Sequence, residues 1–364
     1  MIYREYGKTG KKISVIGFGG MRFAAIDDRD ACVGMMVEAA QSGITYFDTA
    51  PAYSGVKSEQ VFGAGFAEMK RRKLPFYSAT KTFKTTESSI RAEIEAQLKR
   101  LGLESIDFYH VWCIQSLDNW KGRKRDGILK TFRALKDEGL IRHICVSSHL
   151  IGDEVRELLM EGVFEGVLFG YSACNFNVRE KAFEAIAARD LGCVVMNPLG
   201  GGIIPENPGI FDFIRTRQDE TVVEAALRFV ISHKRITCAL VGFATREQVR
   251  EAVKAVDGFS PIPGSEIARM KARLGAAFAE LCTGCQYCDS CPEGIQIPKL
   301  MEAYNHKKLY GTDKALKDRL NWHWNLPPST AAACTECGQC EKLCTQHLPI
   351  IRRMAEIAGL GKKG

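Results

Sequence analysis

Short β-branched segments alternate with longer amphipathic segments from residue 13 to residue 257, and this alternation limits the fold more than any other feature of the sequence. The predicted strands are Ile13–Gly17, Ile44–Asp48, Phe76–Lys81, Ile106–Trp112, Ile141–Val146, Gly166–Phe169, Cys193–Asn197 and Thr237–Gly242. The predicted helices include Asp30–Gln41, Glu87–Leu101, Asp126–Glu138, Asp153–Glu161, Arg179–Arg189, Thr221–Ser232 and Arg246–Val256. Eight strands, each followed by a helix, predict an α/β fold of the (β/α)8 TIM-barrel type. A doubly wound open sheet is the alternative, although residues 17–21 match its glycine-rich dinucleotide turn only in part.

The barrel pattern stops at Phe259–Gly264, a segment rich in turn residues. We therefore predict a barrel domain over residues 1–264 and a small, mainly helical domain over residues 265–364. A helical pattern over Glu266–Leu281 opens the second domain and leads directly into a run of cysteines.

Eight of the 14 cysteines follow residue 281, in two runs. The first run is Cys282-x2-Cys285-x2-Cys288-x2-Cys291, and the second is Cys334-x2-Cys337-x2-Cys340-x3-Cys344. In two-cluster ferredoxins, three closely spaced cysteines hold one [4Fe–4S] cluster and the more distant fourth cysteine serves the other cluster. The runs therefore predict a ferredoxin-like domain with two [4Fe–4S] clusters. We call Cys282, Cys285, Cys288 and Cys344 the first cysteine set, and Cys334, Cys337, Cys340 and Cys291 the second cysteine set.

Structural zinc is the alternative for these thiols, because zinc sites also use paired Cys-x2-Cys motifs. Each run has a third evenly spaced cysteine, which a four-ligand zinc site does not need, and this favours clusters. The other six cysteines lie mostly in apolar segments, where we expect small buried hydrophobic residues: Cys32, Cys113, Cys145, Cys174, Cys193 and Cys238.

The remaining composition predicts a cytoplasmic protein. Residues 1–8 carry charges and lack the apolar core of a signal peptide, and no apolar run approaches the about 20 residues of a membrane-spanning helix. The net charge of +7 is diffuse and forms no basic stripe with interleaved aromatic residues, so we expect neither a nucleic-acid nor a membrane partner. A mildly basic surface suits an acidic redox partner, such as a ferredoxin or a flavodoxin, or an anionic cofactor.

Functional residues of a (β/α)8 barrel lie at the carboxyl ends of its strands. Here Asp48-Thr-Ala-Pro-Ala-Tyr53 follows the second predicted strand, and Ala79-Thr-Lys81 ends the third. Together with Gly17-Phe-Gly-Gly-Met-Arg22 and Asn197-Pro-Leu-Gly-Gly-Gly202, these motifs resemble the signature of the aldo-keto reductase family. The resemblance spans residues 1 to about 257, and the whole chain is similar to the branch of that family with a C-terminal 4Fe–4S dicluster domain.

The resemblance implies a catalytic set of Asp48, Tyr53, Lys81 and His110. Reduction of a carbonyl leaves an alkoxide that must be protonated, and a tyrosine can do this at neutral pH if an adjacent ammonium lowers its pKa from about 10. Lys81 would be that ammonium, with Asp48 as its counter-ion. The alternative is a surface tyrosine, a capping aspartate and a solvated lysine. Their joint position at strand ends favours the catalytic interpretation.

The fourth member of the set departs from the family pattern. Trp112 stands where the family has a histidine, and His110 lies two residues earlier, on the same strand face but about 7 Å deeper. His110 is then a core histidine unless a bulge raises it into the site. Because a tryptophan cannot orient a carbonyl as an imidazole does, reduction of an activated C=C bond is an alternative to carbonyl reduction.

The resemblance also implies a nicotinamide cofactor, NADP or NAD. The residues that would bind it are Gly20, Met21, Arg22, Asp48, Ser147, Ser148, Met196, Leu199, Gly201, Gly242 and Gln248. Residues 242–248 lack the lysine and the later arginine that hold a 2′-phosphate in NADPH-preferring members, and only Arg246 stands nearby, so the choice of cofactor stays open. A flavin would reconcile two-electron and one-electron chemistry, but the sequence shows no flavin motif.

Two functions are compatible with these features. The first is an oxidoreductase that couples a nicotinamide-dependent barrel site, acting on a carbonyl or activated C=C bond of a small molecule, to one-electron transfer through two clusters. The second is a barrel without turnover that acts as a cofactor-sensing or electron-relay subunit, which Trp112 favours. Purely structural clusters are a third, weaker interpretation.

Overall fold

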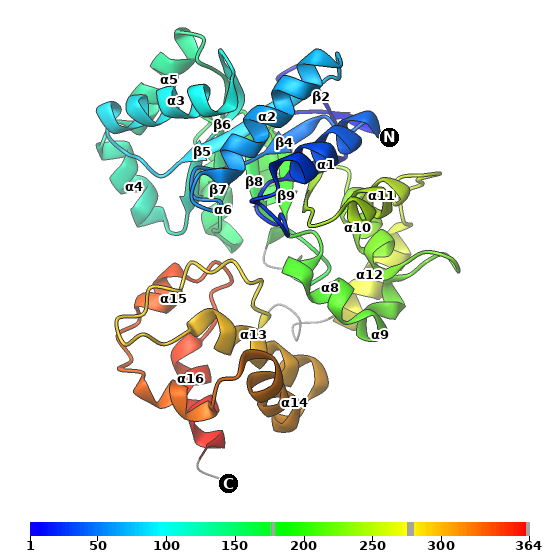
Figure 1. Ribbon diagram of the computed structural model, residues 1–364, viewed down its shortest axis with the longest axis vertical. Helices are drawn as coiled ribbons and strands as arrows, with labels where there is room; N and C mark the ends of the chain where they lie inside the picture. The colour runs from blue at the N-terminus through cyan, green and yellow to red at the C-terminus, as the bar shows by residue number, and fades with distance from the viewer. Residues whose placement is uncertain (175, 177–178, 275–279, 362–364) are drawn as a thin grey trace.

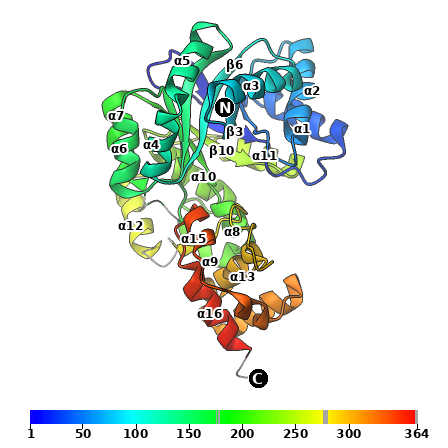
Figure 2. The same cartoon turned by 90° about the vertical axis from the view of Figure 1, so that its left-hand side faces the viewer.

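The computed structural model describes residues 1–174, 176, 179–274 and 280–361. A barrel forms one end of the molecule, and a smaller C-terminal domain, residues 280–361, forms the other, with the C-terminus at the far tip (Figure 1). The same end-to-end arrangement is visible after a turn of 90° (Figure 2). Within the described ranges, no helix is both long enough and apolar enough to cross a membrane.

Eight parallel strands close the barrel in the order β10-β3-β4-β5-β6-β7-β8-β9, as the sequence predicts. These strands are β3 (Ile16–Gly19), β4 (Tyr46–Asp48), β5 (Tyr77–Thr82), β6 (Ile106–Ile114), β7 (Ile141–Ser148), β8 (Gly166–Gly170), β9 (Gly192–Met196) and β10 (Cys238–Gly242). The bounds of the first predicted strand were wrong. The segment Ile13–Gly17 joins part of β3 to β2 (Lys12–Ser14), which pairs with β1 (Tyr3–Glu5) in an antiparallel hairpin. The Ser14 hydroxyl donates to the Ile16 carbonyl at 2.6 Å and breaks the apolar run between β2 and β3.

Helices follow the strands and surround the barrel. They are α1 (Arg29–Gln41), α2 (Lys57–Arg71), α3 (Glu87–Leu101), α4 (Leu117–Arg125), α5 (Ile128–Asp137), α6 (Gly152–Met160), α7 (Ala182–Arg189), α8 (Ile203–Glu206), α9 (Pro208–Phe211), α10 (Val222–Ser232), α11 (Arg246–Lys254) and α12 (Gly264–Leu274). Helices α2 and α4 are not among the helices named from the sequence. Part of the helix predicted over Glu266–Leu281, residues 275–279, lies outside the described residues.

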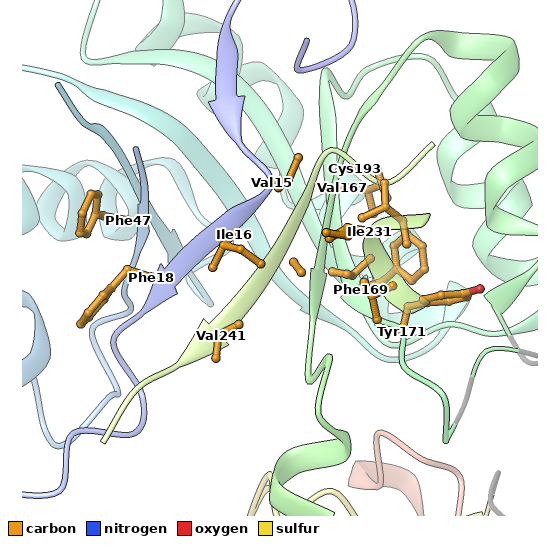
Figure 3. Close-up of a cluster of buried hydrophobic side chains, with 14 of the residues drawn as sticks. Val15, Ile16, Phe18, Phe47, Val167, Phe169, Tyr171, Cys193, Ile231 and Val241 are labelled. Carbon is orange, nitrogen blue, oxygen red and sulfur yellow. The ribbon is translucent and has the colours of Figure 1, made fainter. Parts of the chain in front are cut away.

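Alternation along the strands divides the apolar side chains into two cores. Residues such as Phe18, Val167 and Val241 point outward and pack beneath the helices, where they meet Ile231 of α10 (Figure 3). Residues of the opposite face fill the barrel interior, among them Tyr46, Phe108, Cys145, Val194, Cys238 and Leu240. All six cysteines that precede the two runs are buried, which confirms their expected role as small core residues.

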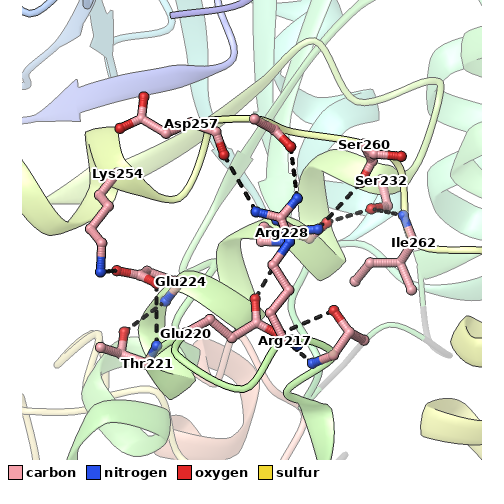
Figure 4. Close-up of polar contacts among 12 residues, drawn as sticks. Arg217, Glu220, Thr221, Glu224, Arg228, Ser232, Lys254, Asp257, Ser260 and Ile262 are labelled. Carbon is pink, nitrogen blue, oxygen red and sulfur yellow. Dashed lines mark hydrogen bonds and ion pairs between the residues drawn. The ribbon is translucent and has the colours of Figure 1, made fainter.

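A polar network fixes α10 and α11 and the segment that leaves the barrel (Figure 4). Thr221 and Glu224 form a capping box at the start of α10, and Lys254 of α11 pairs with Glu224 at 2.8 Å. The Arg228 guanidinium lies 3.4 Å from Glu220 and donates to the Ser260 carbonyl. The next helix, α12, packs on the barrel through Met270, which is fully buried in the barrel core. The predicted domain boundary at residue 264 stays a prediction.

The C-terminal domain is mainly helical, as the sequence predicts. It contains α13 (Ile297–Tyr310), α14 (Asp313–Asp318), the π-helical segment η5 (Arg319–Trp324), the 3-10 segment η6 (Pro328–Ala333), α15 (Gln339–Leu343) and α16 (Ile350–Leu360). Leu300 of α13, Leu320 of η5 and Ile357 of α16 are fully buried in its core. Five cysteines of the two runs, Cys282, Cys291, Cys334, Cys340 and Cys344, pack against this core.

Candidate active site and cysteine cavities

A buried ion pair lies at the carboxyl ends of two neighbouring strands. Asp48 ends β4, and the Lys81 ammonium from β5 lies 2.5 Å from its Oδ1 and donates a second hydrogen bond to the Thr49 carbonyl at 2.9 Å. Both side chains are at most 2% exposed. Burial raises the pKa of the Asp48 carboxyl, and the Lys81 ammonium opposes that rise. Asp48 Oδ2 has no hydrogen-bond partner among the described residues.

Two aromatic rings lie over the Lys81 ammonium. Its Nζ is 5.3 Å from the ring centroid of Tyr53, in the loop after β4, and 5.9 Å from that of Trp112 on β6. The two rings are 5.8 Å apart and nearly perpendicular, and Phe83 stacks on Trp112 at 3.8 Å. Asp48, Tyr53, Lys81 and Trp112 thus meet at the end of the barrel formed by the carboxyl ends of the strands, which we call the barrel mouth.

The pKa of Tyr53 differs from the expectation. Burial raises the pKa of its hydroxyl, and Asp48 adds to this rise, whereas the adjacent Lys81 ammonium was predicted to lower it. The physical reason is that Lys81 faces the ring of Tyr53 while giving hydrogen bonds to Asp48 and Thr49.

No bulge raises His110 into the mouth. Lys81 and His110 are paired in the register of β5 and β6, and the irregularity of β6 falls beyond His110, between Val111 and Ile114. At this irregularity Cys113 takes a left-handed φ of 60°. The His110 imidazole is fully buried, and its Nδ1 lies 3.2 Å from the Thr80 carbonyl. Burial, with a contribution from Lys81, lowers the pKa of His110 to about 3, so the ring is neutral.

The residues proposed to bind the cofactor lie in the loops and strand ends around the mouth. The Gly20 amide donates to the Asp48 carbonyl at 2.8 Å, and a Cβ on Gly20 would lie 2.5 Å from Phe62 and from Ser58. Ser147 and Ser148 are buried at the end of β7. Met196, the last residue of β9, and Leu199, which follows it, are half-buried, and Met21 is exposed. The Gln248 carboxamide accepts from the Ala244 amide at 2.8 Å, so it closes the loop before α11.

Two further glycines permit close approaches by other segments. Arg22 crosses the end of β10, because its Cγ lies 2.6 Å from the position of a Cβ on Gly242. The Thr283 carbonyl of the C-terminal domain lies 2.2 Å from the position of a Cβ on Gly201, which has a φ of +73°. Only glycine allows that contact.

The cysteines of the C-terminal domain surround two cavities. Cys282, Cys285, Cys288 and Cys344 line one, and Cys291, Cys334, Cys337 and Cys340 line the other, which Cys288 lines as well. These groups correspond to the first and second cysteine sets. Within the described residues, no three His, Cys, Asp or Glu side chains come close enough together to hold a single metal ion. Burial, with the neighbouring thiols, raises the pKa of Cys288 to about 12.

The C-terminal domain lies against the barrel mouth. Tyr287, between Cys285 and Cys288, packs with Tyr53 against a small apolar cluster of Ala50, Trp112 and Cys113. Its ring is 5.8 Å from that of His149. Tyr287 was not predicted as a site residue, because nothing in a local sequence pattern marks a contact between residues so far apart in the chain.

Buried hydrogen bonds hold the two domains together. The buried Arg179 guanidinium donates to the carbonyls of Gly170, His149 and Leu150 in the barrel and lies 3.5 Å from the Thr345 carbonyl. The Gln115 amide donates to the Leu343 carbonyl at 2.9 Å. The first cysteine set is thereby fixed beside the mouth.

Comparison with known proteins agrees with this architecture. The model of the Aldo/keto reductase family matches residues 15–274, and the model of the 4Fe-4S dicluster domain matches residues 281–348. L-galactose dehydrogenase of Arabidopsis thaliana is 27% identical over 286 residues, which cover 70% of this chain and 87% of the relative. NADH-specific methylglyoxal reductase of Escherichia coli (strain K12) is 26% identical over 288 residues, with coverages of 66% and 86%.

A solved structure shares the fold. The holo form of an aldo-keto reductase from Bacillus halodurans superposes with a TM-score of 0.65 at 24% identity, covering 76% of this chain and 96% of that one. The family match extends over most of the chain, and the second match covers both cysteine runs. This chain therefore belongs to the aldo/keto reductase family, and a 4Fe–4S dicluster domain follows its barrel.

Proposed function

We propose that the barrel reduces the carbonyl group of a small molecule with a nicotinamide cofactor, and that two [4Fe–4S] clusters exchange single electrons with this site. The observation that carries the proposal is the gathering of Asp48, Lys81 and Tyr53 at the barrel mouth, against Tyr287 from the loop of the first cysteine set. The names of two relatives, L-galactose dehydrogenase and NADH-specific methylglyoxal reductase, support a sugar or aldehyde substrate.

Tyr53 is the proposed proton donor to the developing alkoxide. Its raised pKa keeps the proton on the phenol in the resting site, and an alkoxide is basic enough to take it. Lys81 stabilises the negative charge that develops beside it, since a fixed ammonium in a dry site needs no reorganisation. Asp48 orients the ammonium. His110, neutral and beside Lys81 in the sheet register, is proposed as a positioning residue beneath them.

The nicotinamide cofactor is proposed to bind along the strand ends named above. When bound in its reduced form it would supply a hydride, that is a proton with two electrons, to the carbonyl carbon. Segments of the chain approach closely at three glycines, where a side chain would have no room: Gly20, Gly201 and Gly242. Arg22 offers a cation. The name of the E. coli relative makes NADH the first cofactor to test.

The thiols of the two sets are proposed as cluster ligands. Each cluster carries one electron at a time, so two reduced clusters together would supply the two electrons that, with one proton, regenerate the reduced nicotinamide after the carbonyl has been reduced. A ferredoxin or a flavodoxin is the proposed electron partner. The relay function without turnover is kept as a second candidate, because Trp112, whose ring centroid lies 5.9 Å from the Lys81 ammonium, stands at the position where the family resemblance implies a histidine.

The function is tested on anaerobically purified protein with NADH or NADPH and a panel of aldehydes, ketones, 2-oxoaldehydes and enones. We expect carbonyl-dependent oxidation of the nicotinamide. Oxidation of the nicotinamide with enones alone would favour reduction of a C=C bond. If no substrate supports oxidation in protein with full iron content, but a ferredoxin still reduces the clusters, then the relay function replaces the proposed one.

The cluster ligands are tested by single substitutions. The anaerobic protein should contain about eight iron and eight sulfide per chain, because two cubane clusters hold four of each. Cys344→Ala should damage the cluster of Cys282, Cys285 and Cys288 and spare the other, and Cys291→Ala should do the reverse, as measured by iron content and by electron paramagnetic resonance. Bound zinc in place of iron, or damage to the opposite cluster, would contradict this assignment.

A further inference from the structure

A cleft of about 560 Å³ lies between the barrel and part of the C-terminal domain. Arg22 and Gly201 line it from the barrel, and Thr283, Gly284 and Lys299 line it from the other side. Helix α8, which follows Gly202 directly, lies beside α13 in both views of the molecule (Figures 1 and 2). We call this space the interdomain cleft.

The interdomain cleft shares a wall with the cavity of the first cysteine set. The same four residues, Cys282, Thr283, Gln286 and Pro298, line both spaces. No residue that lines the cavity of the second set lines the cleft. A ligand in the cleft would therefore be one layer of residues away from the first cluster and farther from the second.

In this shared wall, the hydroxyl of Thr283 lacks a hydrogen-bond partner. Thr283 is 5% exposed, and its Oγ1 has no partner among the described residues. A buried hydroxyl without a partner is costly, and such groups in native structures usually meet a ligand or water. The hydroxyl therefore points to a missing partner in one of the two spaces that Thr283 lines.

The cleft also presents two cations that form no ion pair among the described residues. Within the part of the chain that is described, neither Arg22 nor Lys299 forms an ion pair; Arg22 donates weakly to the Gly284 carbonyl at 3.4 Å, and Lys299 lies over the ring of Trp324. Glu302 lines the cleft as well but is paired with Arg319 at 2.5 Å. The carboxylates of Glu206 and Asp289 also line the cleft. Two available cations and a hydroxyl suit a diphosphate, and carboxylates suit the hydroxyl groups of a ribose.

We propose that the interdomain cleft holds the ribose-diphosphate arm of the nicotinamide nucleotide. Thr283 and Lys299 of the C-terminal domain then complete a site that Arg22 and Gly201 begin on the barrel. This inference rests on the proposed use of a nicotinamide cofactor and assigns the loop of the first cysteine set to its binding. The nucleotide thereby contacts the segment that wraps the first cluster.

This placement couples nucleotide binding to the redox state of the first cluster. An anion beside the cluster disfavours the addition of an electron, so nucleotide binding makes the reduction potential more negative. By linkage, reduction weakens nucleotide binding by the same factor. A tenfold change in affinity corresponds to a shift of about 59 mV for a one-electron couple.

The test compares Thr283→Val and Lys299→Met with Thr335→Val in anaerobic holoprotein. Thr335 follows the first cysteine of the second run as Thr283 follows that of the first, but it lines the other cavity and not the cleft. We expect Thr283→Val to weaken binding of ADP-ribose and NADH about tenfold, since it removes a hydrogen bond to a charged group. Lys299→Met should also weaken both, and Thr335→Val should leave both dissociation constants unchanged.

Redox titrations followed by electron paramagnetic resonance provide the second measurement. Saturating ADP-ribose should shift one cluster of the wild-type protein to a more negative potential and leave the other unchanged, and Thr283→Val should reduce the shift at the same ADP-ribose concentration. Iron and sulfide contents verify that the variant retains both clusters. If Thr283→Val loses a cluster, the same titration is carried out with Lys299→Met, which leaves both cysteine runs unchanged.

Three outcomes would overturn the inference. One is wild-type affinity for ADP-ribose in both Thr283→Val and Lys299→Met. Another is an equal shift of both clusters, and the third is a shift of neither. If the wild-type protein binds NADH but shows any of these, then only the cleft assignment fails. If it binds neither NADH nor NADPH, then the proposed nicotinamide function fails as well.

Discussion

Tyr53→Phe is expected to lower kcat by about 10²- to 10⁴-fold, the usual contribution of a positioned general acid. The variant removes only the hydroxyl, and its ring can still pack against Trp112 and over Lys81. Because the proton is needed in the transition state and not for binding, the dissociation constant of NADH should stay nearly unchanged. Steady-state kinetics and a fluorescence titration of NADH measure the two quantities.

A second tyrosine in the same aromatic group supplies the matched comparison. Tyr287 packs against the same apolar cluster as Tyr53, but it belongs to the C-terminal domain. If turnover is lost in Tyr287→Phe and kept in Tyr53→Phe, then the proton donor has been assigned to the wrong tyrosine. If both variants keep full activity on the native substrate, the barrel does not use tyrosine acid catalysis and the relay function gains support.

The barrel is predictable from local sequence because it depends on local periodicity, whereas the pairing of Asp48 with Lys81 was implied by the family resemblance of the motifs at the strand ends. Strand alternation points Tyr46 and Asp48 to one face of β4, and the same rule applies to Ala79 and Lys81 on β5. Closure of the barrel then brings the ends of β4 and β5 together without further information. The grouping of the cysteines follows in the same way from their spacing, since each set lines one cavity.

The features that the sequence did not predict are long-range contacts or local effects with no periodic signal. The contact of Tyr287 with Trp112 and that of Thr283 with Gly201 depend on how two domains pack, which neither local pattern encodes. The start of β3 was misplaced because a single hydroxyl, that of Ser14, interrupts a continuous apolar run. The pKa of Tyr53 depends on whether Lys81 meets its hydroxyl or its ring, and a motif does not specify that geometry.

Lys81→Met is expected to destabilise the barrel by about 3–5 kcal/mol at neutral pH, because it leaves Asp48 buried without its counter-ion. Asp48 should respond by binding a proton. Burial already raises the pKa of this carboxyl, and the variant removes the ammonium that opposes the rise. An alkoxide would also lose its nearest cation, so turnover should fall together with stability.

The loss of stability in Lys81→Met should become larger as the pH rises. An aspartate in an unfolded chain has a pKa of about 3.9, so above that value unfolding of the variant releases a proton until the pH passes the raised pKa of the folded state. The contribution of the protonated Asp48 to stability is therefore complete below about pH 3.9 and is lost as the pH rises, by up to about 1.4 kcal/mol per pH unit. Relative to the wild type, Lys81→Met should have a urea midpoint that falls as the pH rises above about 3.9, as measured by circular dichroism under anaerobic conditions.

The double variant Asp48→Asn, Lys81→Met carries no charge at either position, and replacing both members of a buried pair is often nearly neutral. It should therefore recover part of the stability and lose the added pH dependence. A double variant as unstable as Lys81→Met, or a single variant with the pH profile of the wild type, would show that the buried Asp48 carboxylate is not the source of the instability.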